Sequence, residues 1–432
     1  MTNLPVEVVS YTKKFSSDKW TAELNHKRLF QQIVVIPCLD EYENVISVLD
    51  SLQENSEDVL NDTLILLVIN NSENASVEIK ENNHRTFLFL KDKYFYKKAV
   101  LNVAIVDAFS IDKSLDEKNA GVGLARKIGM DLSLKYFDYS NDQKKIIVCL
   151  DADCTVESNY LFEIRNQFNQ KDLFAAYVNF EHRFSKDKQI NKAIIAYEIF
   201  LRYYVLGLIY ADSPFAFHSI GSTMVCDYSA YIKVQGMNKK KAAEDFYFLE
   251  KLAKIYSIEK IDTTTVYPAA RKSYRVPFGT GQRINRFLAG THNEYELYSP
   301  KIFEVLKSWN QIYYNKNMNQ PEKILEESKN ISKTLHDFLM KKDFINSYNK
   351  ILRNSKSPAQ LSAQKKMWFD GFSTLRLIHL LRDNEFRNEF MFDAIDTMLK
   401  MTNHIPPTQR NLLQMPTLEA QLQYLKLLRT IA

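Results

Sequence analysis

Short runs of apolar residues alternate with segments of helical spacing along the first third of the chain. Four of these runs are continuous rather than alternating, which is typical of strands that are buried on both faces. They are rich in Ile, Val and Leu, residues that suit a buried parallel sheet. We therefore predict buried strands at residues 33–37 (IVVIP), 64–69 (LILLVI), 101–106 and 146–150 (IIVCL).

Helical spacing fills the gaps between these strands. Val45, Val48, Leu49 and Leu52 mark one face of a helix between the first two strands. Residues 121–135 have the same spacing between the third and fourth strands, after a start that contains glycine. Strands separated by helices indicate βαβ units, so we predict an α/β domain with a mostly parallel sheet. Ligands of such a domain bind at the carboxyl ends of its strands.

The pattern changes beyond about residue 300. Dense apolar positions at 368–381 and a leucine stripe at 418–428 predict helices, the last of them close behind Pro416. The polar stretch 315–330 is interpreted as a linker or an exposed turn. We predict three parts: an N-terminal extension at 1–30, an α/β domain at 31–300 and a helical C-terminal region at 301–432.

Composition narrows the class of protein. The chain has 432 residues, which is long for one compact core and favours a larger and a smaller domain. Hydrophobic residues make up 45% and charged residues 25%, as in folded globular proteins. The net charge of +5 is small beside 57 basic and 52 acidic residues. This balance gives no reason to expect a nucleic-acid partner, and it would not repel an anionic ligand.

The cysteines and the N-terminus indicate a reducing compartment. The four cysteines are scattered and show no zinc-binding spacing, so we predict buried, reduced thiols. The N-terminal segment lacks the basic start and apolar core of a signal peptide. Glu198 and Arg202 interrupt the most apolar stretch, residues 193–211, which we interpret as a buried or amphipathic helix. We expect a cytoplasmic protein with at most peripheral membrane contact.

Two carboxylates follow the fourth predicted strand directly. Asp151 and Asp153 are separated by one residue, so both can approach one divalent cation at the end of that strand. Oxygen ligands suit Mg²⁺ and Mn²⁺, which also bridge to phosphate oxygens. A solvated turn is the alternative interpretation of an isolated DxD, and the position behind a buried strand favours the metal site.

Two further turns carry candidate ligand-binding residues. The first strand ends at Pro37, and Asp40 and Glu41 precede a helix, where they could face a base or ribose or could cap the helix. The segment GVGLARK places Arg126 after two glycines, within reach of a diphosphate. It has neither the P-loop nor the dinucleotide-binding spacing, and a plain helix start is its alternative.

In this order the motifs resemble glycosyltransferase family 2 and its GT-A fold. The resemblance covers about residues 30–290 and starts with the VIP strand, a second strand ending in Asn70-Asn71, the GxxxAR helix and the DxD. Farther on, GSTM resembles the acceptor-side segment, AAEDFYFLEKL the ED motif at a helix start, and QRINRF part of a QxxRW motif. Each motif alone has low specificity, and their shared order carries the resemblance.

The resemblance implies a role for each matching residue. Asp151 and Asp153 would hold Mg²⁺ or Mn²⁺ on the donor diphosphate, and Asp245 would be the general base that deprotonates the acceptor hydroxyl. The acceptor side would include Gly221, Ser222 and Glu244. The nucleotide and diphosphate of the donor would be bound by Pro37, Asp40, Glu41, Asn70, Arg126, Asp151, Arg275 and Arg283.

Other side chains are weaker candidates. Arg271 could share the charge of the diphosphate, with the stretch 271–281 as a covering segment, and surface charge is the alternative for each arginine. His218 or His292 could be a third metal ligand, although a lone histidine is more often structural. Asn70 stands where the family usually has an aspartate, which leaves the base open between uracil and guanine.

The resemblance implies a glycosyltransferase of the hexosyltransferase class that uses a UDP- or GDP-sugar. Its acceptor would be a glycan, a lipid-linked molecule or a small molecule, and its mechanism would be inverting. Phe287 replaces the tryptophan of QxxRW, which weakens any analogy with processive polysaccharide synthases. Two alternatives remain: a retaining GT-A synthase that acts on a small phosphorylated acceptor, and a catalytically decayed nucleotide-sugar-binding protein.

Overall fold

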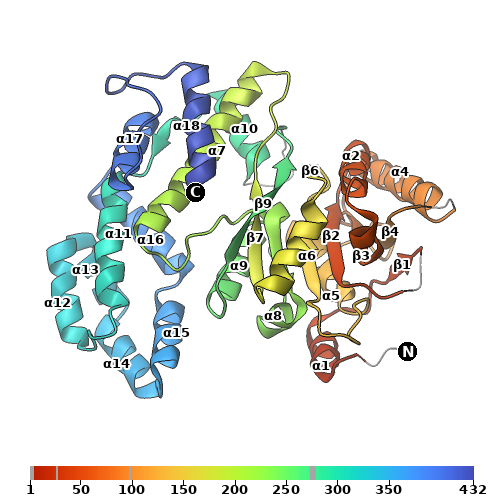
Figure 1. The fold of residues 1–432 in the computed structure, drawn as a ribbon, viewed down its shortest axis with the longest axis horizontal. Coiled ribbons are helices and arrows are strands. Elements are labelled where there is room, and N and C mark those ends of the chain that lie inside the picture. Colours follow the sequence, from red (N-terminus) through yellow and green to blue (C-terminus); the bar gives the residue numbers. More distant parts are fainter. Residues whose placement is uncertain (1–3, 26–27, 97–98, 273–278) are drawn as a thin grey trace.

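A nine-stranded sheet organises the N-terminal two-thirds of the chain in a computed structural model (Figure 1). The structure describes residues 4–25, 28–96, 99–272 and 279–432. The strand order within the sheet is β1-β4-β3-β2-β5-β8-β7-β9-β6. From Pro300 onward the chain is helical apart from one short strand, and this part lies beside the sheet rather than on it.

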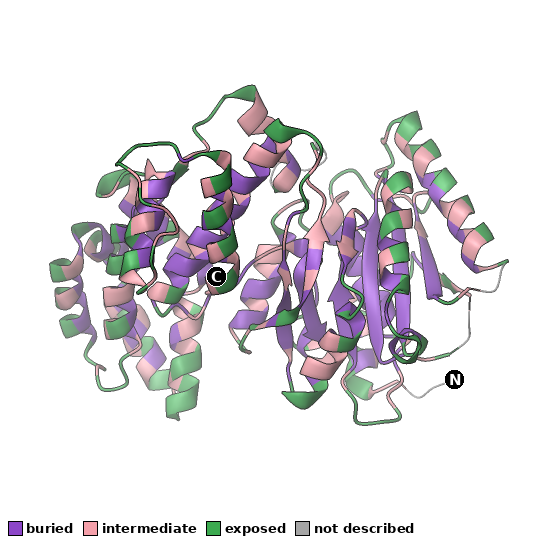
Figure 2. Ribbon diagram, turned by 45° about the horizontal axis from the view of Figure 1, so that its top comes forward, coloured by how far each residue is buried: buried purple, intermediate pink, exposed green. Residues whose placement is uncertain are grey.

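The four predicted strands form the parallel centre of the sheet. They are β4 (Asn102–Ala108), β3 (Thr63–Asn70), β2 (Gln32–Cys38) and β5 (Ile146–Cys149). Every residue of β2, β3 and β5 is buried, as the continuous apolar runs predicted (Figure 2). Since these strands run parallel, their carboxyl ends lie at one edge, where Leu39, Asn71 and Leu150 begin the following loops.

Antiparallel pairs extend the sheet beyond this centre, so the whole sheet is mixed. The strand β1 (Ala22–Leu24) pairs with β4, and β8 (Met224–Asp227) pairs with β5. Next come β7 (Ala175–Phe180), β9 (Glu259–Pro268) and β6 (Cys154–Val156). The segment interpreted as an N-terminal extension thus adds a strand to the sheet, and its helix α1 (Val6–Phe15) packs into the core.

Helices cover both faces of the sheet. One core contains residues of α2 (Tyr42–Gln53), α3 (Glu57–Asn61), α4 (Val77–Tyr94) and α6 (Tyr160–Gln170). The core on the other face contains residues of α1, α5 (Val122–Ser133), α8 (Tyr228–Lys233) and α9 (Glu244–Ala253). The predicted helices α2 and α5 are therefore present, and the four cysteines are buried and free as predicted.

The helix α7 (Lys188–Tyr210) is the centre of another core. Its apolar residues pack with those of the C-terminal region in a cluster that includes Tyr203, Phe303 and Trp309. The C-terminal helices are α11 (Pro300–Tyr313), α12 (Pro321–Ile331), α13 (Lys333–Lys341), α14 (Phe344–Asn354), α15 (Pro358–Trp368), α16 (Gly371–Asn384), α17 (Met391–Met401) and α18 (Leu418–Ile431). The two-residue strands β10 (Glu296–Leu297) and β11 (Glu389–Phe390) pair nearby.

The interpretation of residues 315–330 as a linker or turn is wrong for most of that stretch. Residues 321–331 form α12, with Pro321 in its first turn and Ile324 and Leu325 buried against the helical core. The apolar stripe of this helix is short, and exposed glutamates and lysines surround it in the sequence, so the segment looked polar throughout. Pro at the first helical position is nevertheless a signal for the start of a helix.

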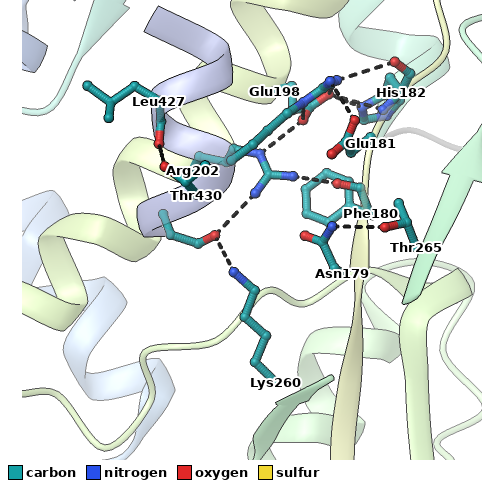
Figure 3. A network of polar contacts seen from close by, with 12 residues as sticks. Asn179, Phe180, Glu181, His182, Glu198, Arg202, Lys260, Thr265, Leu427 and Thr430 are labelled. Carbon is teal, nitrogen blue, oxygen red and sulfur yellow. Dashed lines mark hydrogen bonds and ion pairs between the residues drawn. The ribbon is translucent and has the colours of Figure 1, made fainter. Parts of the chain in front are cut away.

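Buried charges tie α7 to the end of the sheet and to α18 (Figure 3). Glu198 is fully buried and accepts hydrogen bonds from Arg202 (Nε to Oε1, 2.9 Å), Arg429 and the His182 backbone. These partners hold the pKa of Glu198 below its ordinary value, against the effect of burial. Among the described residues α7 is the one helix long and apolar enough to cross a membrane, and 67% of that apolar window is buried inside the protein.

Candidate active site

Side chains from separate segments gather at the carboxyl edge of the parallel strands. Glu41 follows β2, while Asp151 and Asp153 follow β5. Glu244 and Asp245 open α9, which packs near the start of α5. Arg126 and Arg271 pair with all of these carboxylates except Asp245, and each arginine joins carboxylates of two different segments.

Arg126 joins the first pair of carboxylates. Its guanidinium donates through one terminal nitrogen to Asp151 Oδ1 and through the other to Glu244 Oε1. The residue is 2% exposed, and a Cβ on Gly221 would lie 2.6 Å from its Cζ, so the guanidinium needs a glycine there. Burial lowers the pKa of Arg126, but Asp151 and Glu244 raise it above the ordinary value, which keeps the group charged. Arg126 thus positions Asp151 against the start of α9.

Arg271 joins the second pair. It follows β9 and donates from Nε to Asp153 Oδ2 at 2.8 Å, and a terminal nitrogen donates to Glu41 Oε1. Glu41 is 6% exposed, and its other oxygen accepts from Asn44 Nδ2 at 2.6 Å. Two carboxylates from distant parts of the chain therefore converge on one cationic group.

The carboxyl group of Asp245 has a raised pKa. Burial and the neighbouring Glu244 and Asp151 carboxylates raise its pKa to about 7, and Arg126 opposes this only in part. The residue keeps partial exposure, and its Oδ1 accepts from the backbone N–H of Phe246 at 2.7 Å. A carboxyl group that titrates near neutral pH can take up a proton as a general base.

An asparagine network fixes the loops after β2 and β3. Asn70 donates to the carbonyl of Cys38 at 3.2 Å, and Asn83 of α4 donates to the carbonyl of Asn70 at 3.0 Å. The Oδ1 of Asn83 accepts from the backbone N–H of Asp40, a residue with φ of 57°. Asn83 thus holds together Asp40 and Asn70, the two residues predicted to contact the nucleotide of the donor. Helical periodicity gave no signal for Asn83, because a buried asparagine on α4 looks like a surface position.

The glycines before Arg126 have a packing role. A Cβ on Gly123 would lie 2.3 Å from the carbonyl oxygen of Lys240, and one on Gly121 would lie 2.8 Å from Cα of Lys241. The start of α5 therefore packs directly on the backbone that leads into α9. Pro37 is buried within β2, and Gly221 and Ser222 are buried in the short 3-10 helix (Gly221–Thr223) that leads into β8.

The remaining predicted residues lie elsewhere. Arg283 of α10 (Thr280–Ala289) pairs with Glu294 (Nη1 to Oε2, 2.6 Å). His218 is buried between the rings of Tyr177 and Phe180, where burial lowers its pKa to about 3, and His292 is exposed. The structure therefore brings neither histidine to the two aspartates, and Arg275 lies outside the described residues.

The donor set at this edge fits a hard divalent cation. Asp153 and Glu41 already converge on the guanidinium of Arg271, and their side chains supply only oxygen ligands, which Mg²⁺ and Mn²⁺ prefer. Across the described ranges no group of three His, Cys, Asp or Glu residues surrounds one position in the way a preformed metal site would. An ion bound there would take the place of the Arg271 guanidinium.

Comparison with known proteins gives only distant structural similarity. No protein-family profile and no curated protein sequence matches the chain. Solved structures with similarity include S. aureus TarS 1-349 in complex with UDP-GlcNAc, with a TM-score of 0.39 and 10% identity over 78% of this chain and 89% of that chain. TarS 1-349 in complex with UDP has a TM-score of 0.36 and 12% identity over 78% and 91%. Similarity at this level assigns neither family nor activity, so the site residues must carry both.

Proposed function

We propose that this protein is a glycosyltransferase that moves a sugar from a nucleoside-diphosphate sugar to an acceptor hydroxyl. The observation that carries the proposal is the convergence of Glu41, Asp151, Asp153 and Asp245 at the carboxyl edge of a parallel α/β sheet, where such folds bind ligands. The order of the motifs along the chain, which resembles glycosyltransferase family 2, agrees with this arrangement.

Asp245 is the general base of the proposed reaction. Its pKa of about 7 leaves a large fraction ionised at neutral pH while keeping the carboxylate basic enough to accept a hydroxyl proton. Glu244, one residue away, is locked in its pair with Arg126 and cannot serve both roles. Proton removal by Asp245 as the acceptor oxygen attacks the anomeric carbon corresponds to an inverting reaction.

Asp151 and Asp153 are the proposed ligands of Mg²⁺ or Mn²⁺, and Glu41 is close enough to Asp153 to contribute. A bound divalent ion would neutralise charge on the diphosphate of the leaving nucleotide. Arg126 orients Asp151 through a hydrogen bond. Asn70, Asn83 and Asp40 fix the loops proposed to contact the nucleobase and ribose. Arg271 pairs with both Asp153 and Glu41.

The test is nucleotide release from a panel of UDP- and GDP-sugars with Mn²⁺. Slow hydrolysis of one donor without acceptor, lost in Asp153→Ala, is the result expected of a transferase. Binding of a donor with no turnover under any acceptor would identify the nucleotide-sugar-binding alternative. The anomeric configuration of the product separates the inverting from the retaining reaction. The cytoplasmic location stays a prediction, to be tested by fractionation with high-salt washes.

A further inference from the structure

A cavity of about 360 Å³ lies between α7, α10 and α16, apart from the carboxylates at the strand ends. This volume falls within the range of small-molecule binding sites. Its walls include three arginines, Arg283 and Arg286 of α10 and Arg382 of α16, together with His292. The helical region therefore contributes one wall and the α10 segment another.

The arginine side chains are fixed in place but still reachable. Glu294, whose side chain is 8% exposed, pairs with Arg283 through one oxygen (2.6 Å) and with Arg286 through the other (2.7 Å). Arg382 pairs with the exposed Asp383 at 2.7 Å. The three guanidinium-bearing side chains are 27%, 32% and 33% exposed. One buried carboxylate thus holds two cations at the wall of the cavity without enclosing them.

The arginines retain donors that no described acceptor uses. A guanidinium has five N–H donors. Arg283 and Arg286 each reach Glu294 through one terminal nitrogen, and Arg382 bonds to Asp383 through Nε and also to Tyr298. The Nε of Arg286 is buried and has no hydrogen-bond partner among the described residues. An unpaired buried N–H of a charged group is costly, and an oxyanion within reach would remove that cost.

The cavity also has aromatic walls. Phe200 lies under the guanidinium of Arg283, with Cζ 4.6 Å from the ring centroid, which fixes the direction of that arginine. Tyr298 forms another wall, and its hydroxyl is held by His379 Nε2 at 3.0 Å. Rigid rings beside the arginines provide a surface for a less polar part of the same ligand.

Tyr197 of α7 lies next to Arg283 of the cavity. The ring centroid of Tyr197 lies 5.8 Å from Cζ of Arg283. Burial raises the pKa of Tyr197 to about 12, and both Arg283, which lowers it, and Asp245, which raises it, act on this hydroxyl. The pKa of Tyr197 is therefore shifted by the Asp245 carboxylate as well as by Arg283.

We infer that this cavity binds an oxyanion, a phosphate or carboxylate, of the acceptor molecule. The identification as an acceptor site rests on the proposed function, whereas the oxyanion site stands on the cavity alone. Arg286 and Arg382 hold the oxyanion through their spare N–H donors, and Phe200 and Tyr298 contact the adjoining part of the ligand. The acceptor is thus an anionic molecule, such as a phosphorylated or carboxylated polyol or sugar, whose hydroxyl reaches Asp245.

The oxyanion site is tested by calorimetry with inorganic phosphate, glycerol 3-phosphate, succinate and uncharged glycerol. The wild type should bind at least one anion saturably and should not bind glycerol; phosphate and succinate distinguish the two kinds of oxyanion. Arg286→Gln and Arg382→Gln should each weaken that binding by about tenfold to a hundredfold, the effect of losing a charge-assisted hydrogen bond. Arg382→Lys keeps the charge but loses the two-pronged guanidinium, so its anion affinity should lie between those of the wild type and Arg382→Gln.

Arg387→Gln is the matched control, because Arg387 is exposed close to α16 and does not line the cavity. Equal weakening in this control, unchanged binding in the two Gln variants, or no saturable anion binding would overturn the site. Arg382 pairs with the exposed Asp383 and with Tyr298 and takes no part in the buried Glu294 pairs, so its variants stay informative even if Arg286→Gln fails to fold. Anion binding that displaces the donor sugar would overturn the acceptor assignment, while anion binding in a protein without donor turnover would overturn the proposed function alone.

Discussion

The strand-end site and the α10 cavity are both rich in charge, yet their arginines are used in opposite ways. At the strand ends Arg126 and Arg271 each bridge two carboxylates, so that acidic groups outnumber basic ones. In the cavity Arg283 and Arg286 share the carboxylate of Glu294, and three arginines face two carboxylates, those of Glu294 and Glu296. The first arrangement favours a cation and the second an anion.

Burial deepens this difference. Arg126 is enclosed by Gly221, Asp151 and Glu244, so its charge is already paired with carboxylates of the protein. Arg286 and Arg382 keep about a third of their side chains exposed. An arginine near a proposed active site is therefore not by itself a substrate ligand: its partners decide whether it positions other residues or binds a molecule from solution.

The largest expected effect comes from Asp245, the proposed base at the start of α9. Asp245→Asn keeps the size of the side chain and removes its basicity, so sugar transfer should fall by about 10²–10⁴-fold. Donor affinity measured by calorimetry should stay close to that of the wild type, because Asp245 pairs with none of the groups proposed to hold the diphosphate. The exposed Asp262 of β9 provides the control, and Asp262→Asn should transfer normally. Near-normal transfer by Asp245→Asn would remove the proposed base.

Removing the buried guanidinium of Arg126 should lower the stability of the protein rather than change which ligand it binds. Arg126→Met leaves the Glu244 carboxylate buried without a counter-charge, so the free energy of unfolding should fall by about 3–5 kcal/mol. The matched change is Arg165→Met, which removes a more exposed pair with Asp62 and should cost about 0–1 kcal/mol. Chemical denaturation of both variants gives the comparison. Similar costs for the two would show that Arg126 is not the structural centre of this site.

The pH dependence of transfer should report the environment of Asp245. Since its folded pKa is raised to about 7, the rate should increase by up to about tenfold per pH unit below pH 7 and level off above it. The unfolded carboxyl titrates near 3.8, so the folded state holds the extra proton between the two values. Stability should therefore decline as pH rises from about 4 to 7, and Asp245→Asn should lack that decline. A transfer rate without an inflection between pH 6 and 8 would contradict the assignment.

Periodicity predicted the parts of the fold that are buried on both faces. The four central strands and helices α2, α5 and α18 lie where their apolar runs placed them. The strands outside the parallel centre were not predicted, because β6 and β8 are short and only three of the ten residues of β9 are buried, so none has a long apolar run. Pairing between distant strands is decided by tertiary contacts, and α12 shows the same limit for a short apolar stripe.

Only the site residues that lie next to a predicted strand or helix could be placed from the sequence. Asp151 and Asp153 follow a buried strand, and Asp245 opens a helix, so their positions could be inferred from neighbours in the sequence. Nothing local indicated that Arg271 would meet both Asp153 and Glu41, or that Asn83 would hold the loop at Asp40. The partners of an arginine come from the fold. The sequence suggested diphosphate binding for Arg126 and Arg283, but it did not indicate that Glu244 and Glu294 would pair with them.

The central claim is that the strand-end carboxylates bind a nucleoside-diphosphate sugar with a divalent ion. Thermal unfolding of the wild type with a panel of UDP- and GDP-sugars and Mn²⁺ tests it most directly. One donor should raise the melting temperature saturably. At a hundred times its Kd, the bound donor should increase the free energy of unfolding by about 2.7 kcal/mol. Asp153→Ala should lose this shift, and Asp142→Ala, an exposed change at the opposite end of β5, should keep it. A panel in which no donor shifts the wild type, or in which Asp153→Ala responds equally, would contradict the claim.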